Sequence, residues 1–164
     1  MKSAPPRVFI AASVLDAVLR AHKAAVGGAK EPCGLMLGHV DGVRVHVEEV
    51  RVLDNVHPTP DRAFLLPATG AVAAAREARE RGLTVLGVWH GHLRGPAKLS
   101  ESDAAGLASA ARGAAARGTD SPYVFLVSGH GAGTSVVVRA FVHLRTRPRE
   151  VRLDMLLPSK AKSA

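Results

Sequence analysis

The stretch LTVLGVWHGH, residues 83–92, decides the fold. Residues 83–89 are apolar and rich in β-branched and aromatic side chains, which is typical of a buried strand. Because side chains alternate along a strand, His90 and His92 are predicted to lie side by side on one face, at the strand's carboxyl end. Two neighbouring imidazoles are a good beginning for zinc, which takes His nitrogen, Cys sulfur or carboxylate oxygen in tetrahedral geometry.

A third ligand is expected downstream of the histidines. Residues 93–99 contain a Gly-Pro pair and are predicted as a loop, whereas the Ala-rich residues 104–116 are predicted as a helix. Asp103 then falls in the first turn, where the helix dipole favours an ionised carboxylate. Together, His90, His92 and Asp103 would leave a fourth position for water, which is the layout of a catalytic rather than a structural zinc site.

The spacing H-x-H-x7-S-x2-D, formed by His90, His92, Ser100 and Asp103, resembles the signature of the JAMM (MPN+) family of zinc metallopeptidases. That family also has a glutamate well upstream of the histidines. Here the segment EPCGLMLG, residues 31–38, resembles the family's E-x-C-G-L-L-L-G segment. Further resemblances lie at residues 55–58 with Phe64 and at residues 123–128, so that the likeness covers roughly residues 30–143 in order.

This resemblance implies an α/β fold in which a mixed sheet is flanked by helices in α/β/α layers, similar to the cytidine-deaminase arrangement. It implies Zn²⁺ as the cofactor, with His90, His92 and Asp103 as metal ligands. It makes Glu31 the general base that takes a proton from water and later delivers it to the leaving amine. It gives Ser100 the task of stabilising the oxyanion on the attacked carbonyl. A plain helix cap is the simpler interpretation of Ser100, and both interpretations can hold at once.

The sequence departs from the family pattern at two positions. The family usually has Ser or Thr between the histidines and Pro after the second, whereas this chain has Gly91 and Leu93. Neither position is a metal ligand in the family, so we expect effects on strand rigidity and substrate contacts. Cys33 is interpreted as a small core residue, with a thiol that touches the metal as the alternative. His57 is interpreted as a solvated loop residue that could approach the cleft. The remaining histidines are interpreted as structural: His22, His39, His46, His130 and His143.

Other metal centres fit the residues less well. Two histidines and a carboxylate also bind non-haem iron(II), but iron oxygenases commonly place the carboxylate between the two histidines. Cupins share H-x-H but need a carboxylate within a few residues, and residues 93–99 contain none.

The composition fits one domain, predicted over residues 1–156, followed by a disordered basic tail over residues 157–164. Hydrophobic residues make up 47% and aromatic residues 4%, so the core must be built from Val, Leu and Ala. No signal peptide or membrane span is expected. The single cysteine, Cys33, excludes an intramolecular disulfide, and a cytoplasmic, reducing setting is expected. The high content of Ala, Arg and Gly is typical of bacterial proteins from GC-rich genomes.

The pattern along the chain predicts the element order α-β-β-α-β-α-β-β. A loose start is expected over residues 2–6, and a two-residue hairpin turn at Asp41-Gly42. Helices are predicted over residues 11–26, 67–80 and 104–116, and strands over residues 31–40, 43–53, 83–89, 123–128 and 135–144, with an added edge strand over 151–156.

The net charge of +8 is explained equally well by a basic solvated surface in an Ala- and Arg-rich protein and by an acidic protein partner; a nucleic acid is a further alternative. Nucleic acid is not expected, because the basic residues are spread along the chain and aromatic residues for base stacking are nearly absent. The resemblance implies a ubiquitin-like protein or its conjugate as substrate, cleaved at a peptide or isopeptide bond of its C-terminal tail. Small sulfur-carrier proteins are one such class in prokaryotes. The alternative is a non-catalytic scaffold of the same fold, although such relatives have usually lost the ligands. The oligomeric state stays open, with a homodimer as one option.

Overall fold

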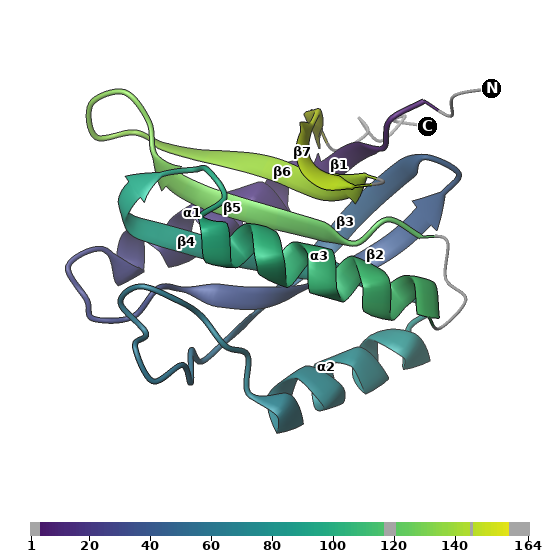
Figure 1. Ribbon diagram of the computed structural model, residues 1–164, viewed down its shortest axis with the longest axis horizontal. Coiled ribbons are helices and arrows are strands. Elements are labelled where there is room, and N and C mark those ends of the chain that lie inside the picture. The colour runs from purple at the N-terminus through teal and green to yellow at the C-terminus, as the bar shows by residue number, and fades with distance from the viewer. Residues whose placement is uncertain (1–3, 117–120, 145, 158–164) are drawn as a thin grey trace, which may run out of the picture.

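The structure is a computed structural model that describes residues 4–116, 121–144 and 146–157 (Figure 1). The expected tail over residues 157–164 lies outside this range except for its first residue. In chain order the elements are β1 Arg7–Ala11, α1 Ala12–Ala25, β2 Cys33–Asp41, β3 Arg44–Leu53, α2 Ala68–Glu80, β4 Thr84–Pro96, α3 Glu101–Ala116, β5 Val124–His130, β6 Val136–Leu144, β7 Arg147–Val151 and β8 Leu153–Leu156.

The strands form one mixed sheet of eight, in the order β7-β6-β5-β4-β2-β3-β1-β8. The central strand β4 runs antiparallel to β2 and parallel to β5. Helix α1 packs on one face of the sheet, where Val14 and Val18 join a core cluster that contains Trp89. Helices α2 and α3 pack on the other face, where Ala74 and Leu107 join a second core cluster (Figure 1). The predicted α/β/α arrangement is therefore confirmed.

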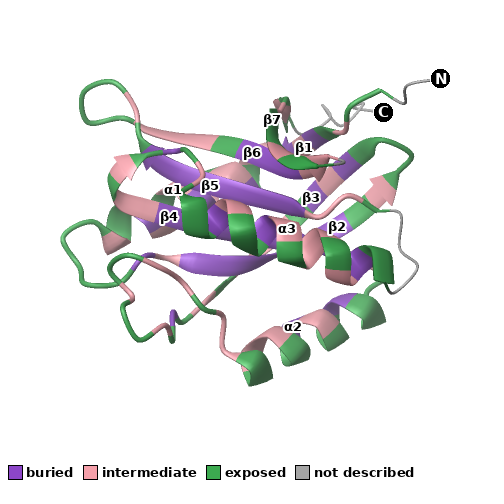
Figure 2. Cartoon of the chain, viewed as in Figure 1, coloured by how far each residue is buried: buried purple, intermediate pink, exposed green. Residues whose placement is uncertain are grey.

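The sheet is strongly curled. Only Arg152 separates β7 from β8, although these two strands form opposite edges of the sheet. The backbone of Val8 in β1 donates a hydrogen bond to the carbonyl of Arg152, at 2.9 Å. Figure 1 accordingly shows β7 and β1 close together. The C-terminal segment thus joins the two edges. The strands near the middle of the sheet, β2, β4 and β5, each carry a continuous run of six buried residues (Figure 2).

Most predicted elements are confirmed, but the ends of the sheet are not. Strand β1 was not predicted: residues 7–10 lie between the loose start over residues 2–6 and the helix predicted from residue 11, so the expected element order was incomplete. The edge strand predicted over residues 151–156 is observed as β8, which begins at Leu153 and lies at one edge of the sheet, whereas β7 at the other edge was not predicted. The hairpin turn lies one residue later than predicted, because Asp41 still pairs with Arg44 and leaves Gly42 and Val43 in the turn. No helix within the described residues is long and apolar enough to cross a membrane.

The length of β4 corrects the prediction that the strand ends at the two histidines. This strand continues to Pro96, through residues that were predicted as a loop, and Pro96 pairs with His130 of β5 after an irregularity. His90 is therefore the central residue of a long strand, and neither His90 nor His92 lies at its end.

Candidate metal centre

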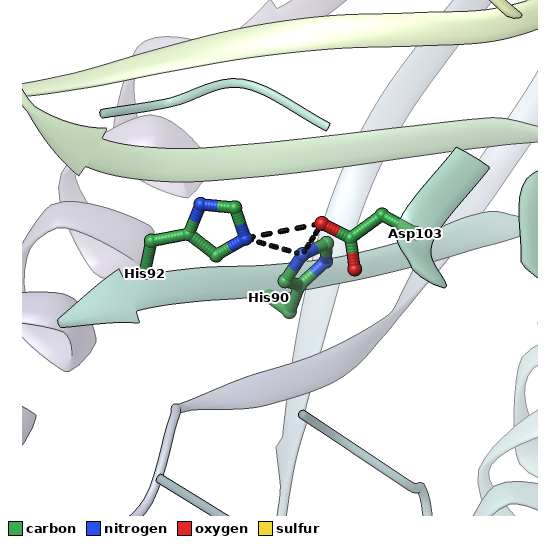
Figure 3. A group of neighbouring side chains, drawn as sticks. All are labelled: His90, His92 and Asp103. Atoms are coloured by element: carbon green, nitrogen blue, oxygen red, sulfur yellow. Dashed lines mark hydrogen bonds and ion pairs between the residues drawn. The ribbon is translucent and has the colours of Figure 1, made fainter. Parts of the chain in front are cut away.

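His90 and His92 project from the same face of β4, toward the side covered by α2 and α3. His90 is completely buried, and the His92 side chain is 16% exposed. Asp103 lies in the first turn of α3 and is 9% exposed. Figure 3 shows the three side chains converging on one point, as the spacing in the sequence predicted.

The atoms that meet there are two imidazole nitrogens and one carboxylate oxygen. His90 Nε2 lies 3.2 Å from His92 Nε2. Asp103 Oδ2 lies 3.2 Å from His90 Nε2 and 3.1 Å from His92 Nε2. Two ligands of a tetrahedral zinc ion are separated by about 3.3 Å, given bonds of about 2.0–2.1 Å. The three donor atoms therefore already have the spacing that a tetrahedral metal ion requires, and their chemistry, two nitrogens and one oxygen, suits zinc.

The start of α3 fixes the aspartate. The Ser100 backbone N–H donates to Asp103 Oδ2 at 2.9 Å, and the Asp103 N–H donates to Ser100 Oγ at 3.0 Å. This reciprocal pair is a capping box, in which each side chain satisfies a backbone donor at the helix start. The simpler interpretation of Ser100 is thus confirmed. Its Oγ accepts a hydrogen bond, and the hydroxyl proton stays available to a group outside the helix.

The charges of the three residues depend on one another. Burial raises the pKa of Asp103, but the hydrogen bonds with His90 and His92 outweigh burial and hold this pKa well below its usual value. The hydrogen bond with Asp103 raises the pKa of His92. Burial lowers the pKa of His90, and the contact with Asp103 only partly opposes this. The carboxylate is therefore ionised, and a divalent cation would compete with a proton for the imidazole nitrogens.

Glu31 lies across from His92, just before β2. Cys33 pairs with His90, and the Gly91 N–H donates to the Pro32 carbonyl at 2.9 Å, so continuing this antiparallel register brings Glu31 opposite His92. Glu31 is only 7% exposed. Burial raises the pKa of Glu31 to about 7; His92 opposes this rise, whereas Asp103 adds to it. In the metal-free chain this carboxyl group can therefore both accept and deliver a proton near neutral pH.

Cys33 shares this region but takes no part in the centre. Its side chain is fully buried, and its thiol donates a weak hydrogen bond to the Leu53 carbonyl at 3.7 Å. Burial raises the pKa of the Cys33 thiol to about 12, which keeps it protonated. The interpretation of Cys33 as a small core residue therefore fits its surroundings, and it is not among the clustered metal-binding side chains of the described residues.

A polar network that the sequence did not indicate lies behind β4, on the face opposite the two histidines. Ser128 Oγ lies 2.7 Å from His22 Nδ1 and accepts a hydrogen bond from Trp89 Nε1 at 3.0 Å. All three side chains are completely buried. A β-carbon on Gly91 would lie 2.6 Å from His22 Nδ1, so the imidazole occupies the space that a Ser or Thr side chain would need. The departure from the family pattern at Gly91 therefore has a structural counterpart in His22, and no local pattern in the sequence connects these positions.

Beyond its resemblance to the family and the interpretation of His57, the sequence did not indicate a role for the loop before α2. Phe64 stacks on the His90 ring, with centroids 4.3 Å apart. His57 does not enter the centre; its Nδ1 accepts a hydrogen bond from the Thr59 N–H at 3.0 Å. The role of Asn55, which is buried in this loop, was not predicted.

JAMM-type domains have a mixed sheet between helices, in which two histidines of a strand face an aspartate in the first turn of a helix. The chain belongs to the family described as prokaryotic homologs of the JAB domain, which matches residues 11–143. The structure is similar to the solution structure of protein DSY2949 from Desulfitobacterium hafniense, with a TM-score of 0.69 over 94% of this chain and 95% of that one. The two sequences are 22% identical, so this likeness concerns the fold alone.

One curated relative is named a probable TtuB-protein conjugate cleaving protease and comes from Thermus thermophilus. It is 38% identical over 74 residues, which are 45% of this chain and 47% of the relative. The match therefore spans about half the length of this relative.

Proposed function

We propose that this chain is a zinc-dependent peptidase that hydrolyses a peptide or isopeptide bond at the C-terminal tail of a ubiquitin-like protein. The observation that carries the proposal is the triangle of donor atoms from His90, His92 and Asp103, with edges of 3.1–3.2 Å. The membership of the JAB family and the name of the Thermus relative support the class of reaction and substrate.

In this proposal, His90, His92 and Asp103 hold the metal and leave one position for water or substrate. Bound zinc supplies Lewis acidity, which activates water near neutral pH and polarises the carbonyl under attack. The carboxylate of Glu31 accepts a proton from the attacking water. The same carboxyl group then delivers that proton to the amine as the carbon–nitrogen bond breaks, so that one water yields a carboxylate product and a free amine.

Ser100, at the start of α3, is the proposed hydrogen-bond donor in the same reaction. Its Oγ accepts from the Asp103 N–H, so its own O–H can donate to the oxygen that becomes negative during attack. The capping box holds the hydroxyl in place before substrate arrives, and such a preorganised donor lowers a barrier by about 3 kcal/mol.

The first experiment measures bound zinc by elemental analysis in the wild type, His92→Ala and Glu31→Gln. We expect about one zinc per chain in the wild type and in Glu31→Gln, and much less in His92→Ala, because His92 is one of the three proposed ligands and Glu31 is not. Zinc-loaded wild type is then incubated with a ubiquitin-like protein that carries either a C-terminal extension or an isopeptide-linked lysine peptide. The products are identified by mass spectrometry.

We expect the wild type to release the C-terminal extension or the lysine peptide from the ubiquitin-like protein, and Glu31→Gln to lose this turnover while it keeps its zinc. If the wild type takes up no zinc after reconstitution, the enzyme proposal is wrong, and a scaffold of the same fold becomes the function to test. If Glu31→Gln cleaves as fast as the wild type, the proton-transfer role of Glu31 is wrong.

A further inference from the structure

The two histidines of the centre are held in different ways. A metal-binding histidine usually donates its second ring N–H to a carbonyl or carboxylate, which fixes the orientation of the ring. His92 follows this rule, since its Nδ1 lies 3.0 Å from the carbonyl oxygen of Pro96. His90 does not, because its buried Nδ1 has no hydrogen-bond partner among the described residues. Some other contact must therefore set the plane of the His90 ring.

Two phenylalanine rings make that contact. Phe64 stacks on His90 with centroids 4.3 Å apart and an interplanar angle of 16°. Phe125, in β5, meets His90 edge-on at 6.1 Å and 82°. The two phenylalanines also contact each other, at 6.2 Å and 69°. A flat ring held on its face and on its edge has little freedom to rotate, so these contacts can replace the missing hydrogen bond.

Phe64 belongs to a loop without regular structure, residues 54–67, so its own position needs support. Asn55 provides it from within the loop, with its side chain buried. Asn55 Oδ1 accepts hydrogen bonds from the N–H groups of His57 and Leu65, both at 3.0 Å. Asn55 Nδ2 donates to the carbonyl of Ala63 at 2.9 Å. One amide group therefore holds the backbone on both sides of Phe64.

The same loop also holds Glu31. The Glu31 N–H donates to the Pro60 carbonyl at 2.7 Å. Asn55 Nδ2 donates to the Glu31 carbonyl at 3.1 Å. Both backbone polar groups of Glu31 are thus bonded to a segment that, through Phe64, touches His90. The loop connects the residue proposed to move protons with a residue proposed to bind the metal.

We propose that Phe64 is a positioning residue for His90, and that Asn55 folds the 54–67 loop so that Phe64 and Glu31 keep a fixed relation to each other. This inference rests on the proposed metal centre and adds two residues to its support. It assigns them no contact with substrate.

The test compares zinc affinity in the wild type, Phe64→Leu and Leu65→Ala, by competition with a chromogenic chelator. Leucine keeps an apolar side chain at position 64 but cannot stack on an imidazole. Leu65→Ala is the matched control, because this neighbouring apolar side chain is 52% exposed. We expect Phe64→Leu to bind zinc roughly 10-fold more weakly, as when an outer support of a metal ligand is lost, and Leu65→Ala to bind like the wild type.

A second measurement separates positioning from general loss of stability. The visible spectrum of the cobalt(II)-loaded protein depends on the geometry of the ligands, and we expect its bands to change in Phe64→Leu but not in Leu65→Ala. Asn55→Asp keeps acceptor oxygens for His57 and Leu65 but loses the N–H donors to Ala63 and Glu31. We expect it to weaken zinc binding in the same direction as Phe64→Leu.

The outcomes distinguish this inference from the proposed function. If the wild type binds zinc and Phe64→Leu shows the same affinity and the same cobalt spectrum, the role of Phe64 is wrong while the metal centre stands. If only Phe64→Leu is affected and Asn55→Asp behaves like the wild type, the role of Asn55 is wrong. If the wild type binds neither metal, the proposed function fails and this inference fails with it.

Discussion

Glu31 carries a carboxyl group that is only 7% exposed, with Asp103 close enough to raise its pKa. Burial of an acid without a direct cationic partner disfavours the charged form, and here it raises the pKa to about 7. Such a group is suited to proton transfer near neutral pH. It also lowers the stability of the metal-free fold whenever it must ionise inside the protein.

We therefore predict that Glu31→Gln stabilises the metal-free protein at pH 8. The folded chain holds the Glu31 proton up to about pH 7, whereas the unfolded chain releases it near pH 4.5. Between these values the folded state binds more protons, so wild-type stability falls as pH rises, and glutamine escapes this loss. The shift corresponds to at most about 3 kcal/mol. Urea unfolding of both proteins with a metal chelator present, at pH 4.5 and pH 8, measures the difference.

The control is Glu101→Gln, which changes an exposed glutamate in the first turn of α3. We expect its effect to be small and nearly equal at both pH values. A Glu31→Gln protein that is no more stable than wild type at pH 8 would show that the buried carboxylate is compensated by contacts in the fold.

Among single residues, the sequence predicted the side chains that carry the metal-binding atoms, but not the residues that hold those side chains in place. His90, His92 and Asp103 meet because strand alternation and a helix start bring them together, and both are local features that a spacing reveals. Asn55 and Phe64 were noted by resemblance alone, without a role. Their contacts with Glu31 and His90 join segments that are far apart in the sequence, so no local periodicity indicates them.

Among the elements, β4 and α1 depend on each other at Gly91. This residue lies between the two histidines on the opposite face of β4, next to His22 of α1. A β-carbon there would lie 2.6 Å from His22 Nδ1, 2.8 Å from Pro32 Cγ and 2.9 Å from Ser128 Oγ. Such distances cannot be accommodated without movement of the helix or the strand. The position of α1 is therefore linked to the strand that presents the centre.

We predict that Gly91→Ala destabilises the fold by about 1–3 kcal/mol, as overpacking in a core does. His22→Ala removes a buried, hydrogen-bonded side chain and should cost about 2 kcal/mol. The double variant should lose less than the sum, by about 1 kcal/mol, because the alanine at position 22 leaves room for the new methyl group. Denaturant unfolding of the wild type, the two single variants and the double variant measures this coupling as a double-mutant cycle.

Gly95→Ala is the matched control, since it lies in the same strand and its β-carbon would meet no atom within 4 Å. We expect it to leave stability nearly unchanged and to show no coupling with His22→Ala. Strict additivity of Gly91→Ala and His22→Ala would contradict the contact inferred between them.

Secondary structure was most predictable in long segments with a regular hydrophobic pattern. Helix α2 was predicted over residues 67–80 and is observed from Ala68 to Glu80, with Gly82 at a φ of 76° after its end. Strand β1 was missed because its five residues are too few to show a clear periodicity, and residues 7–10 received no predicted element. It is a strand because β3 and β8 pair with it on both sides, which is a tertiary effect.

For the whole molecule, the curled sheet brings the first strand and the last strands of the domain into contact. Residues 8–11 pair with β8, and Asp154 of β8 accepts a hydrogen bond from the Arg7 side chain at 2.7 Å. The C-terminal segment also pairs with β6 through β7, so it joins both edges of the sheet. The alternating order of helices and strands predicted the layers, but it did not predict this joining, because pairing between edge strands leaves no signal in either short segment alone.

We predict that zinc stabilises the whole domain and that the effect requires Asp103. A ligand that binds only the folded state adds about 2.7 kcal/mol at 100 times its dissociation constant, which for a domain of this size raises Tm by roughly 5–10 °C. Thermal unfolding with and without zinc measures this rise, and a chelator should reverse it. Asp103→Asn keeps an oxygen for the Ser100 N–H but loses the charged metal ligand, so its Tm should hardly respond to zinc. An equal rise in both proteins would mean that the stabilising zinc binds elsewhere, since the centre formed by β4 and α3 is the one that this substitution changes.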